Sequence, residues 1–89
     1  MRARIIESGY DVRRDAYYGV FEYDGAEYYA DVCYVPFGGY TECMIFKSEN
    51  RQIADAGSEL YCKREIPVTE LQLFKCIDEF ITTLTTKNN

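Results

Sequence analysis

Histidine is absent from the chain. Without an imidazole, no side chain has an ordinary pKa near neutral pH, so histidine general bases, Ser-His and Cys-His pairs and histidine-assisted zinc sites are excluded. An enzyme of this composition would have to rely on carboxylates, tyrosine, lysine or a thiol. The Gly38-Gly39 pair is typical of a turn rather than a phosphate loop, because no helix with Lys and Ser or Thr follows it. We therefore expect a protein without catalytic activity, cofactor or metal.

Close cysteine pairs and long apolar runs are also missing. Cys33, Cys43, Cys62 and Cys76 are separated by 10, 19 and 14 positions, so there is no CxxC motif for zinc or disulfide exchange. Residues 1–6 lack the apolar run of a signal peptide, and no segment approaches the roughly 20 apolar residues of a membrane span. We expect one domain over residues 1–89, in the cytoplasm, with four reduced thiols. A disulfide between two of them is the alternative.

The first half of the chain is rich in strand-forming residues. Asp24-Gly25 separates two runs of Tyr, Val and Phe, Tyr17 to Tyr23 and Ala26 to Val35, which predicts a hairpin with a two-residue turn. The register pairs Tyr23 with Ala26, Phe21 with Tyr28, Gly19 with Ala30 and Tyr17 with Val32. Because strand side chains alternate, these eight residues share one face, and that face is apolar.

Three further strand segments are expected. A turn at residues 36–39 separates the hairpin from a strand over Tyr40 to Lys47, which has apolar residues on both faces and should therefore be central. A strand around Ala3 to Ser8 would pair with this meander. A polar connection from Ser48 to Ser58 leads to a short segment, Glu59 to Ile66, that could form another strand.

The clearest predicted element is a helix near the C-terminus. Thr69 is a helix cap with Gln72 at the third helical position, a capping box, and Val68 and Leu73 occupy the positions of a hydrophobic staple. An apolar stripe follows at helical spacing: Leu73, Phe74, Ile77, Phe80, Ile81 and Leu84. The fold class is α+β, an antiparallel meander sheet of four to five strands with one C-terminal helix packed on one face.

Charge is distributed unevenly. Between Asp15 and Phe46 there are six acidic residues and no Lys or Arg, and the whole chain has a net charge of −5. The face of the sheet away from the helix combines acidic, aromatic and apolar side chains. Its candidate interaction residues are Tyr18, Glu22, Glu27, Tyr29, Asp31, Glu42, Met44 and Phe46.

Three interpretations of this acidic face stay open. The first is a solvated surface. The second is a surface for an unidentified protein partner, because Tyr is favoured at interfaces. The third is a mimic of nucleic-acid phosphates that blocks a DNA-binding enzyme. The net negative charge argues against direct binding of nucleic acid or of an anionic membrane. If Val20, Met44 and Phe46 are exposed, this apolar patch should be covered, either by a second copy in a homodimer or by residues 48–58.

Two catalytic hypotheses are weaker. Glu22 and Glu27 pair across the hairpin and could divide acid and base roles, but an open sheet face does not desolvate them. Cys62 precedes Lys63 and Arg64, and cations beside a thiol favour the thiolate, so a reactive thiol is one hypothesis; a small buried thiol in a strand is the favoured one.

Three segments carry a resemblance: residues 27–32 (EYYADV), 42–46 (ECMIF) and 60–69 (LYCKREIPVT). Together they resemble small proteins encoded on conjugative and other mobile elements of gut Firmicutes. The likeness spans most of residues 17–81. It implies no activity and no site residues, only a genomic setting in which small acidic proteins sometimes inhibit host defence enzymes.

Overall fold

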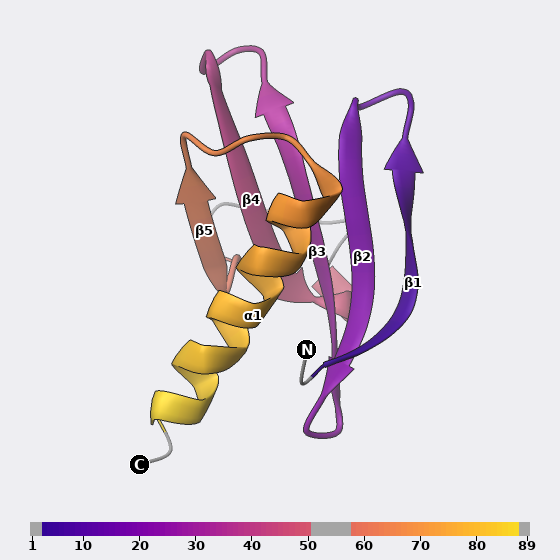
Figure 1. Cartoon of the computed structure of the whole chain (residues 1–89), viewed down its shortest axis with the longest axis vertical. Coiled ribbons are helices and arrows are strands. Elements are labelled where there is room, and N and C mark those ends of the chain that lie inside the picture. Colours follow the sequence, from indigo (N-terminus) through magenta and orange to yellow (C-terminus); the bar gives the residue numbers. More distant parts are fainter. Residues whose placement is uncertain (1–2, 51–57, 88–89) are drawn as a thin grey trace.

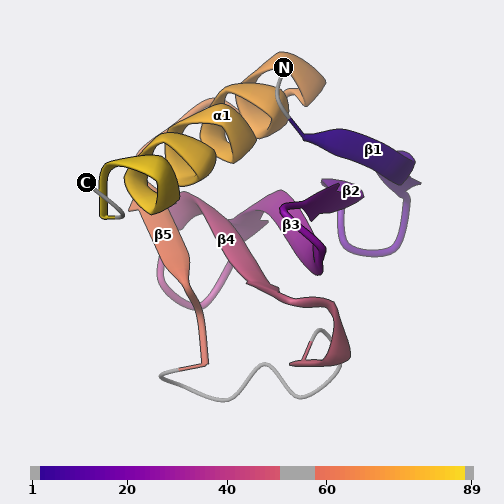
Figure 2. The same cartoon turned by 90° about the horizontal axis from the view of Figure 1, so that it is seen from below.

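The computed structural model describes residues 3–50 and 58–87, which form one antiparallel sheet and one long helix (Figure 1). The strands are β1 (Arg4–Asp11), β2 (Ala16–Tyr23), β3 (Ala26–Val35), β4 (Tyr40–Lys47) and β5 (Tyr61–Arg64). A short 3-10 helix, η1 (Ser48–Asn50), follows β4, and the helix α1 spans Glu70–Lys87. The strands lie in chain order, and α1 crosses one face of the sheet (Figure 2). The predicted α+β meander is therefore confirmed.

The Asp24-Gly25 turn sets the register of β2 and β3. Both residues have positive φ, 53° and 81°, as a two-residue hairpin turn requires. All four predicted cross-strand pairs are present. Phe21, Tyr28 and Val32 consequently point toward α1 and are buried.

Aromatic contacts between the sheet and α1 form the centre of the core. The ring of Tyr28 lies 5.2 Å from that of Phe21 and 5.2 Å from that of Phe80, the second contact edge-to-face. Leu73 and Ile77 are also buried on the sheet-facing side of α1. Each such side chain contributes roughly 1.5–3 kcal/mol through removal from water. The predicted apolar stripe therefore fastens α1 to the sheet.

The two edge strands differ in length from the prediction. β1 continues to Asp11, beyond the expected end at Ser8, because it pairs with β2 as far as Asp11 and Ala16, with a bulge between Ile5 and Glu7. β5 is shorter than the expected segment Glu59 to Ile66. It ends at Arg64 because Glu65 has a φ of 60°, which turns the chain out of the extended conformation.

Only half of the predicted capping box forms at the start of α1. The backbone N–H of Gln72 donates to Thr69 Oγ1 at 3.1 Å, so Thr69 is the helix cap. The Gln72 side chain does not close the box; its amide nitrogen lies 3.4 Å from Cys76 Sγ and donates there. Gln72 therefore couples the first turn of α1 to a buried thiol.

Candidate functional site

All eight candidate residues lie on the face of the sheet opposite α1, which we call the open face. The β2–β3–β4 register aligns Tyr18, Asp31 and Met44 in one row and Tyr29 and Phe46 in the next. Glu22 pairs with Glu27, and Glu42 lies opposite Cys33. The alternation inferred from the sequence thus places these side chains together.

The apolar side chains of the open face are largely buried. Val20 and Phe46 are only 4% and 5% exposed, so the condition for an exposed apolar patch is not met at these two residues. Met44 is half-buried. Of the two covers considered for such a patch, the connection after β4 is described in part: η1 lies on the side of the sheet away from α1 and contacts β3 and β4 (Figure 2). η1 is the first part of the connection from Ser48 to Ser58, which was one of the two proposed covers. Residues 51–57 of this connection lie outside the described residues.

Three of the candidate acids are neutralised by arginines from outside the acidic stretch. Glu22 lies 3.4 Å from Arg4, whereas Asp31 and Glu42 are 6% and 9% exposed. Arg14 Nη2 lies 2.8 Å from Asp31, and Arg64 Nε lies 3.3 Å from Glu42. A buried carboxylate needs such a partner. The open face is therefore a charge-paired surface rather than a uniformly acidic one.

Tyr29 and Arg14 connect the centre of the open face to the β1–β2 turn. The Tyr29 hydroxyl lies 3.2 Å from both Arg14 Nη1 and Asp31 Oδ2. Burial, followed by the Asp31 charge, raises the pKa of Tyr29 to about 12. The Asp11 carboxylate accepts the backbone N–H of Arg13 at 3.0 Å and so holds this turn in place. The network orders an arginine that would otherwise extend freely into solvent.

The thiol of Cys62 does not have the environment that its sequence neighbours suggest. Strand alternation turns Lys63 to the opposite face, and Arg64 pairs with Glu42. Cys62 is an exposed residue, and desolvation and the nearby Glu42 carboxylate raise the pKa of its thiol by more than Arg64 lowers it, so the net shift is opposite to the one considered from the sequence. Cys62 Sγ lies 3.7 Å from Glu42 Oε2.

The Glu22–Glu27 pair has the predicted register but lacks a desolvated environment. The Glu22 side chain is 45% exposed and faces Arg4, and Glu27 is exposed. Two exposed carboxylates are not separated into an acid and a base by their surroundings. This geometry supplies no general acid–base pair.

A groove of about 550 Å³ lies beside Tyr18 and Tyr29, and we call it the tyrosine groove. The two rings are stacked with centroids 6.4 Å apart. The groove is lined by Glu7, Tyr10, Asp11, Val12, Arg13, Tyr18 and Tyr29. Tyr29 also borders a second hollow of about 360 Å³, which extends toward Met44 and Phe46. The sequence pointed to Tyr18 and Tyr29 but missed the contribution of β1.

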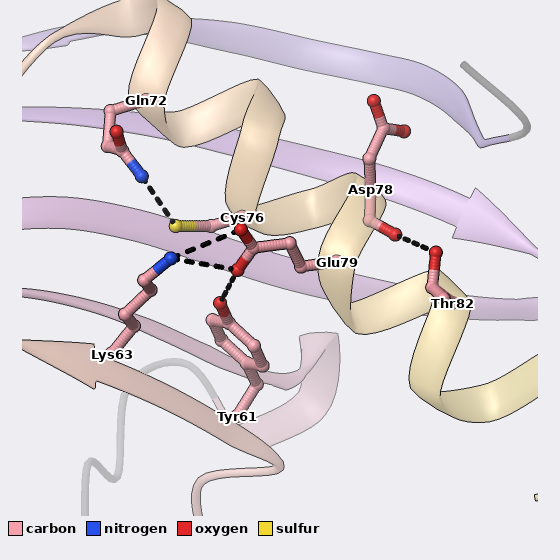
Figure 3. Close-up of polar contacts among 7 residues, drawn as sticks. All are labelled: Tyr61, Lys63, Gln72, Cys76, Asp78, Glu79 and Thr82. Carbon is pink, nitrogen blue, oxygen red and sulfur yellow. Dashed lines mark hydrogen bonds and ion pairs between the residues drawn. The ribbon is translucent and has the colours of Figure 1, made fainter. Parts of the chain in front are cut away.

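A second polar cluster lies where α1 meets β5, and the sequence did not suggest it (Figure 3). Glu79 accepts from Lys63 Nζ at 3.1 and 3.2 Å and from the Tyr61 hydroxyl at 2.5 Å. The hydrogen bond from Tyr61 lowers the pKa of Glu79 the most, and the hydrogen bonding from Lys63 lowers it further. Cys76 and Gln72 lie alongside on α1. The available signal was the alternation in β5, which turns Tyr61 and Lys63 toward the helix.

No family model, curated protein or solved structure matches the chain. No helix in the described part of the chain combines the length and apolarity needed to cross a membrane. Within residues 3–50 and 58–87, no three His, Cys, Asp or Glu side chains gather as they would around a metal ion.

Proposed function

We propose that this chain is a non-enzymatic cytoplasmic interaction protein that binds a positively charged, extended segment of a partner protein in the tyrosine groove. The observation that carries the proposal is the groove itself, in which two stacked tyrosine rings lie beside the carboxylates of Glu7 and Asp11. Tyrosine faces attract Lys and Arg side chains, and carboxylates pair with them.

The charges around the groove favour a basic ligand. Glu7 is exposed and forms no ion pair within the described residues, unlike Glu22, Asp31 and Glu42. Arg13 is the one cation in the lining, so the groove carries a net charge of −1, from two carboxylates and one guanidinium. The net charge of −5 adds long-range attraction for a basic partner and argues against direct nucleic-acid binding.

The position of β1 favours an extended ligand. β1 is the first strand of the sheet order and pairs only with β2 among the described strands. An extended segment can add to such an edge through backbone hydrogen bonds while its alternate side chains enter a neighbouring groove. Glu7 and Asp11 belong to β1 and line the groove beside that edge.

A labelled peptide tests this proposal. We expect a fluorescein-labelled peptide alternating Lys and Val to bind at low salt, measured by fluorescence anisotropy, and to bind more weakly as salt screens the charges. Glu7→Gln should weaken binding roughly fivefold, since an exposed charge pair contributes up to about 1 kcal/mol. Tyr18→Ala should weaken it roughly tenfold, about 1.4 kcal/mol, through lost cation–π contact.

Matched controls separate the groove from general charge and aromatic content. Glu70→Gln changes the same charge on α1, and Tyr34→Ala removes an exposed tyrosine away from the groove. Neither should change affinity. Equal losses for Glu7→Gln and Glu70→Gln would mean that bulk charge drives binding, which overturns the groove as the site.

A homodimer through this groove is the first alternative. Two copies with a net charge of −5 would bring like-charged grooves together, so we expect a monomer by sedimentation equilibrium. A dimer that Tyr18→Ala dissociates would make a second copy the occupant and overturn the basic partner.

Mimicry of nucleic-acid phosphates is the weaker alternative. A row of phosphates carries unpaired negative charge, whereas Glu22, Asp31 and Glu42 each face an arginine at 3.4 Å or less. Inhibition of a basic nuclease that Glu22→Gln with Glu27→Gln abolishes and Glu7→Gln leaves intact would favour mimicry over the groove.

A further inference from the structure

Gly9 leaves a gap in the middle of the edge strand β1 (Figure 1). The regular part of β1 runs from Glu7 to Asp11, because a bulge interrupts the pairing with β2 between Ile5 and Glu7. Gly9 is the centre of this regular part and pairs with Tyr18 of β2. Since cross-strand partners share a face of the sheet, a side chain at this position would stand between Tyr18 and the sheet edge. Glycine places none there.

The ring of Tyr18 occupies the space above Gly9. A β-carbon on Gly9 would lie 3.0 Å from the Tyr18 hydroxyl oxygen and 3.1 and 3.2 Å from the ring atoms Cε1 and Cζ. These distances are shorter than the optimal separation of two carbon atoms, roughly 3.5–4.0 Å. The hydroxyl end of the ring therefore leans over Gly9 toward the edge of the sheet. The same ring stacks on Tyr29 of β3, with centroids 6.4 Å apart.

Two carboxylates flank the gap at Gly9. Glu7 and Asp11 stand two residues before and after it, so strand alternation places both on the same face as Tyr18. All three residues line the tyrosine groove. Glu7 is exposed and has no ion pair in the described part of the chain. Asp11 accepts the backbone N–H groups of Arg13 and Arg14 through Oδ1 alone, at 3.0 and 3.4 Å, which leaves Oδ2 as an acceptor.

We infer that the tyrosine groove recognises one Lys or Arg side chain of the bound segment, carried by the residue that pairs with Gly9. The inference rests on the proposed function, in which an extended segment adds to the edge of β1. The side chain opposite Gly9 then lies on the open face, beside the ring of Tyr18 and between the two flanking carboxylates. Diagonal neighbours on adjacent strands are about 7–8 Å apart, within reach of a long side chain. Its cation contacts both the ring and the carboxylates.

The charge of the groove matches a single cation. Its lining contains Glu7, Asp11 and Arg13, so one bound Lys or Arg brings the net charge of −1 to zero. Arg13 belongs to the β1–β2 turn, beyond the end of β1 at Asp11. An acidic side chain opposite Gly9 would be repelled by the two carboxylates. An apolar one would shield them from water without supplying a partner.

The test uses fluorescein-labelled peptides with one Lys at the centre of an uncharged segment of alternating Thr and Val. In fluorescence anisotropy at low salt, replacing that Lys by Gln should weaken binding to the unaltered chain roughly tenfold. Glu7→Gln and Asp11→Asn should each weaken binding of the Lys peptide about threefold, because one cation contacts both carboxylates. Asp11→Asn keeps a side-chain oxygen for the N–H groups of the turn.

Gly9→Ala tests the gap itself. The added methyl group would displace the hydroxyl end of the Tyr18 ring, so the preference for Lys over Gln should fall to about threefold or less. Ser8→Ala is the matched control, because Ser8 is the neighbouring residue and its side chain lies on the other face of β1. It should leave the preference unchanged. Should Gly9→Ala lose the native circular dichroism, Tyr18→Leu is the second variant and should reduce the preference in the same way.

A nuclear Overhauser contact between the ε-methylene protons of the peptide Lys and the Tyr18 ring is the expected direct signature. Equal affinities of the Lys and Gln peptides, while the Lys-Val peptide still binds and Glu7→Gln still weakens it, would overturn the single-cation site and leave the proposed function standing. A Lys peptide that is weakened by Glu7→Gln but not by Asp11→Asn would also overturn it. Failure of the Lys-Val peptide to bind would remove the proposed function and this inference together.

Discussion

Arg14 Nη2 donates to Asp31 Oδ2 at 2.8 Å across the open face, joining the β1–β2 turn to the centre of β3. Asp31 is 6% exposed, and its carboxylate also accepts from the Tyr29 hydroxyl. A carboxylate buried to this degree is stable only when paired. The pair therefore holds the β1–β2 turn, which borders the tyrosine groove. It also positions Tyr29, which lines the groove and contacts both partners.

Removing Arg14 should leave the Asp31 charge inadequately paired. We expect Arg14→Met to lower the free energy of unfolding by about 2 kcal/mol, the range for a lost hydrogen bond to a charged group, measured by urea denaturation. Adding Asp31→Leu should recover more than half of that loss. Arg4→Met at the exposed Arg4–Glu22 pair is the matched control and should cost less than about 1 kcal/mol. Equal costs at the two sites would contradict the assigned burial.

Tyr29 should make the fold sensitive to alkaline pH. Its pKa is raised to about 12 from an ordinary value of 10, so folding favours the neutral phenol. That contribution to stability is complete below pH 10 and is lost as the pH rises through 12. Tyr29→Phe should flatten the decline in unfolding free energy across this window, measured by urea denaturation at a series of pH values, and an unchanged decline would contradict the burial of this phenol.

The cap of α1 offers a local test of the helix start. Thr69→Ala removes the acceptor for the Gln72 backbone N–H and should cost about 1 kcal/mol in urea denaturation. Thr86→Ala, at an exposed position near the end of the same helix, should be neutral or slightly stabilising because Ala is the better helix former. A loss at Thr86 as large as that at Thr69 would argue against the cap.

Two phenylalanines distinguish the core from the surface. Phe80 is 2% exposed and packs its ring against Tyr28, whereas Phe37 is 103% exposed in the β3–β4 turn. We expect Phe80→Ala to cost about 3–5 kcal/mol and Phe37→Ala to change the unfolding free energy by less than about 0.5 kcal/mol. Comparable losses would mean that the helix does not supply the core.

Local features of the sequence account for the elements that were predicted well. The Asp24-Gly25 turn determines the hairpin register because a two-residue loop allows only one pairing of its flanking strands. The spacing of Leu73, Ile77 and Phe80 determines which side of α1 is buried. The ends of β1 and β5 were predicted poorly, since each depends on pairing with a neighbouring strand and on a local turn in the backbone.

Contacts between distant segments account for what was missed. The stretch from Asp15 to Phe46 has no basic residue. Even so, Arg14 in the β1–β2 turn pairs with Asp31, and Arg64 at the end of β5 pairs with Glu42. Cys62 has two cationic sequence neighbours, but Lys63 points to the other face of the sheet, and Arg64, on the same face, is paired with Glu42. Adjacency in sequence was a poor guide to electrostatic environment in both cases.

By itself the sequence determined the fold class, the hairpin register, the buried side of α1 and the membership of the open face. These follow from backbone periodicity and turn geometry, which act over a few residues. Only the tertiary structure decided which carboxylates are neutralised and that Val20 and Phe46 are buried. Periodicity says which way a side chain points, whereas its partner is set by how separate elements pack.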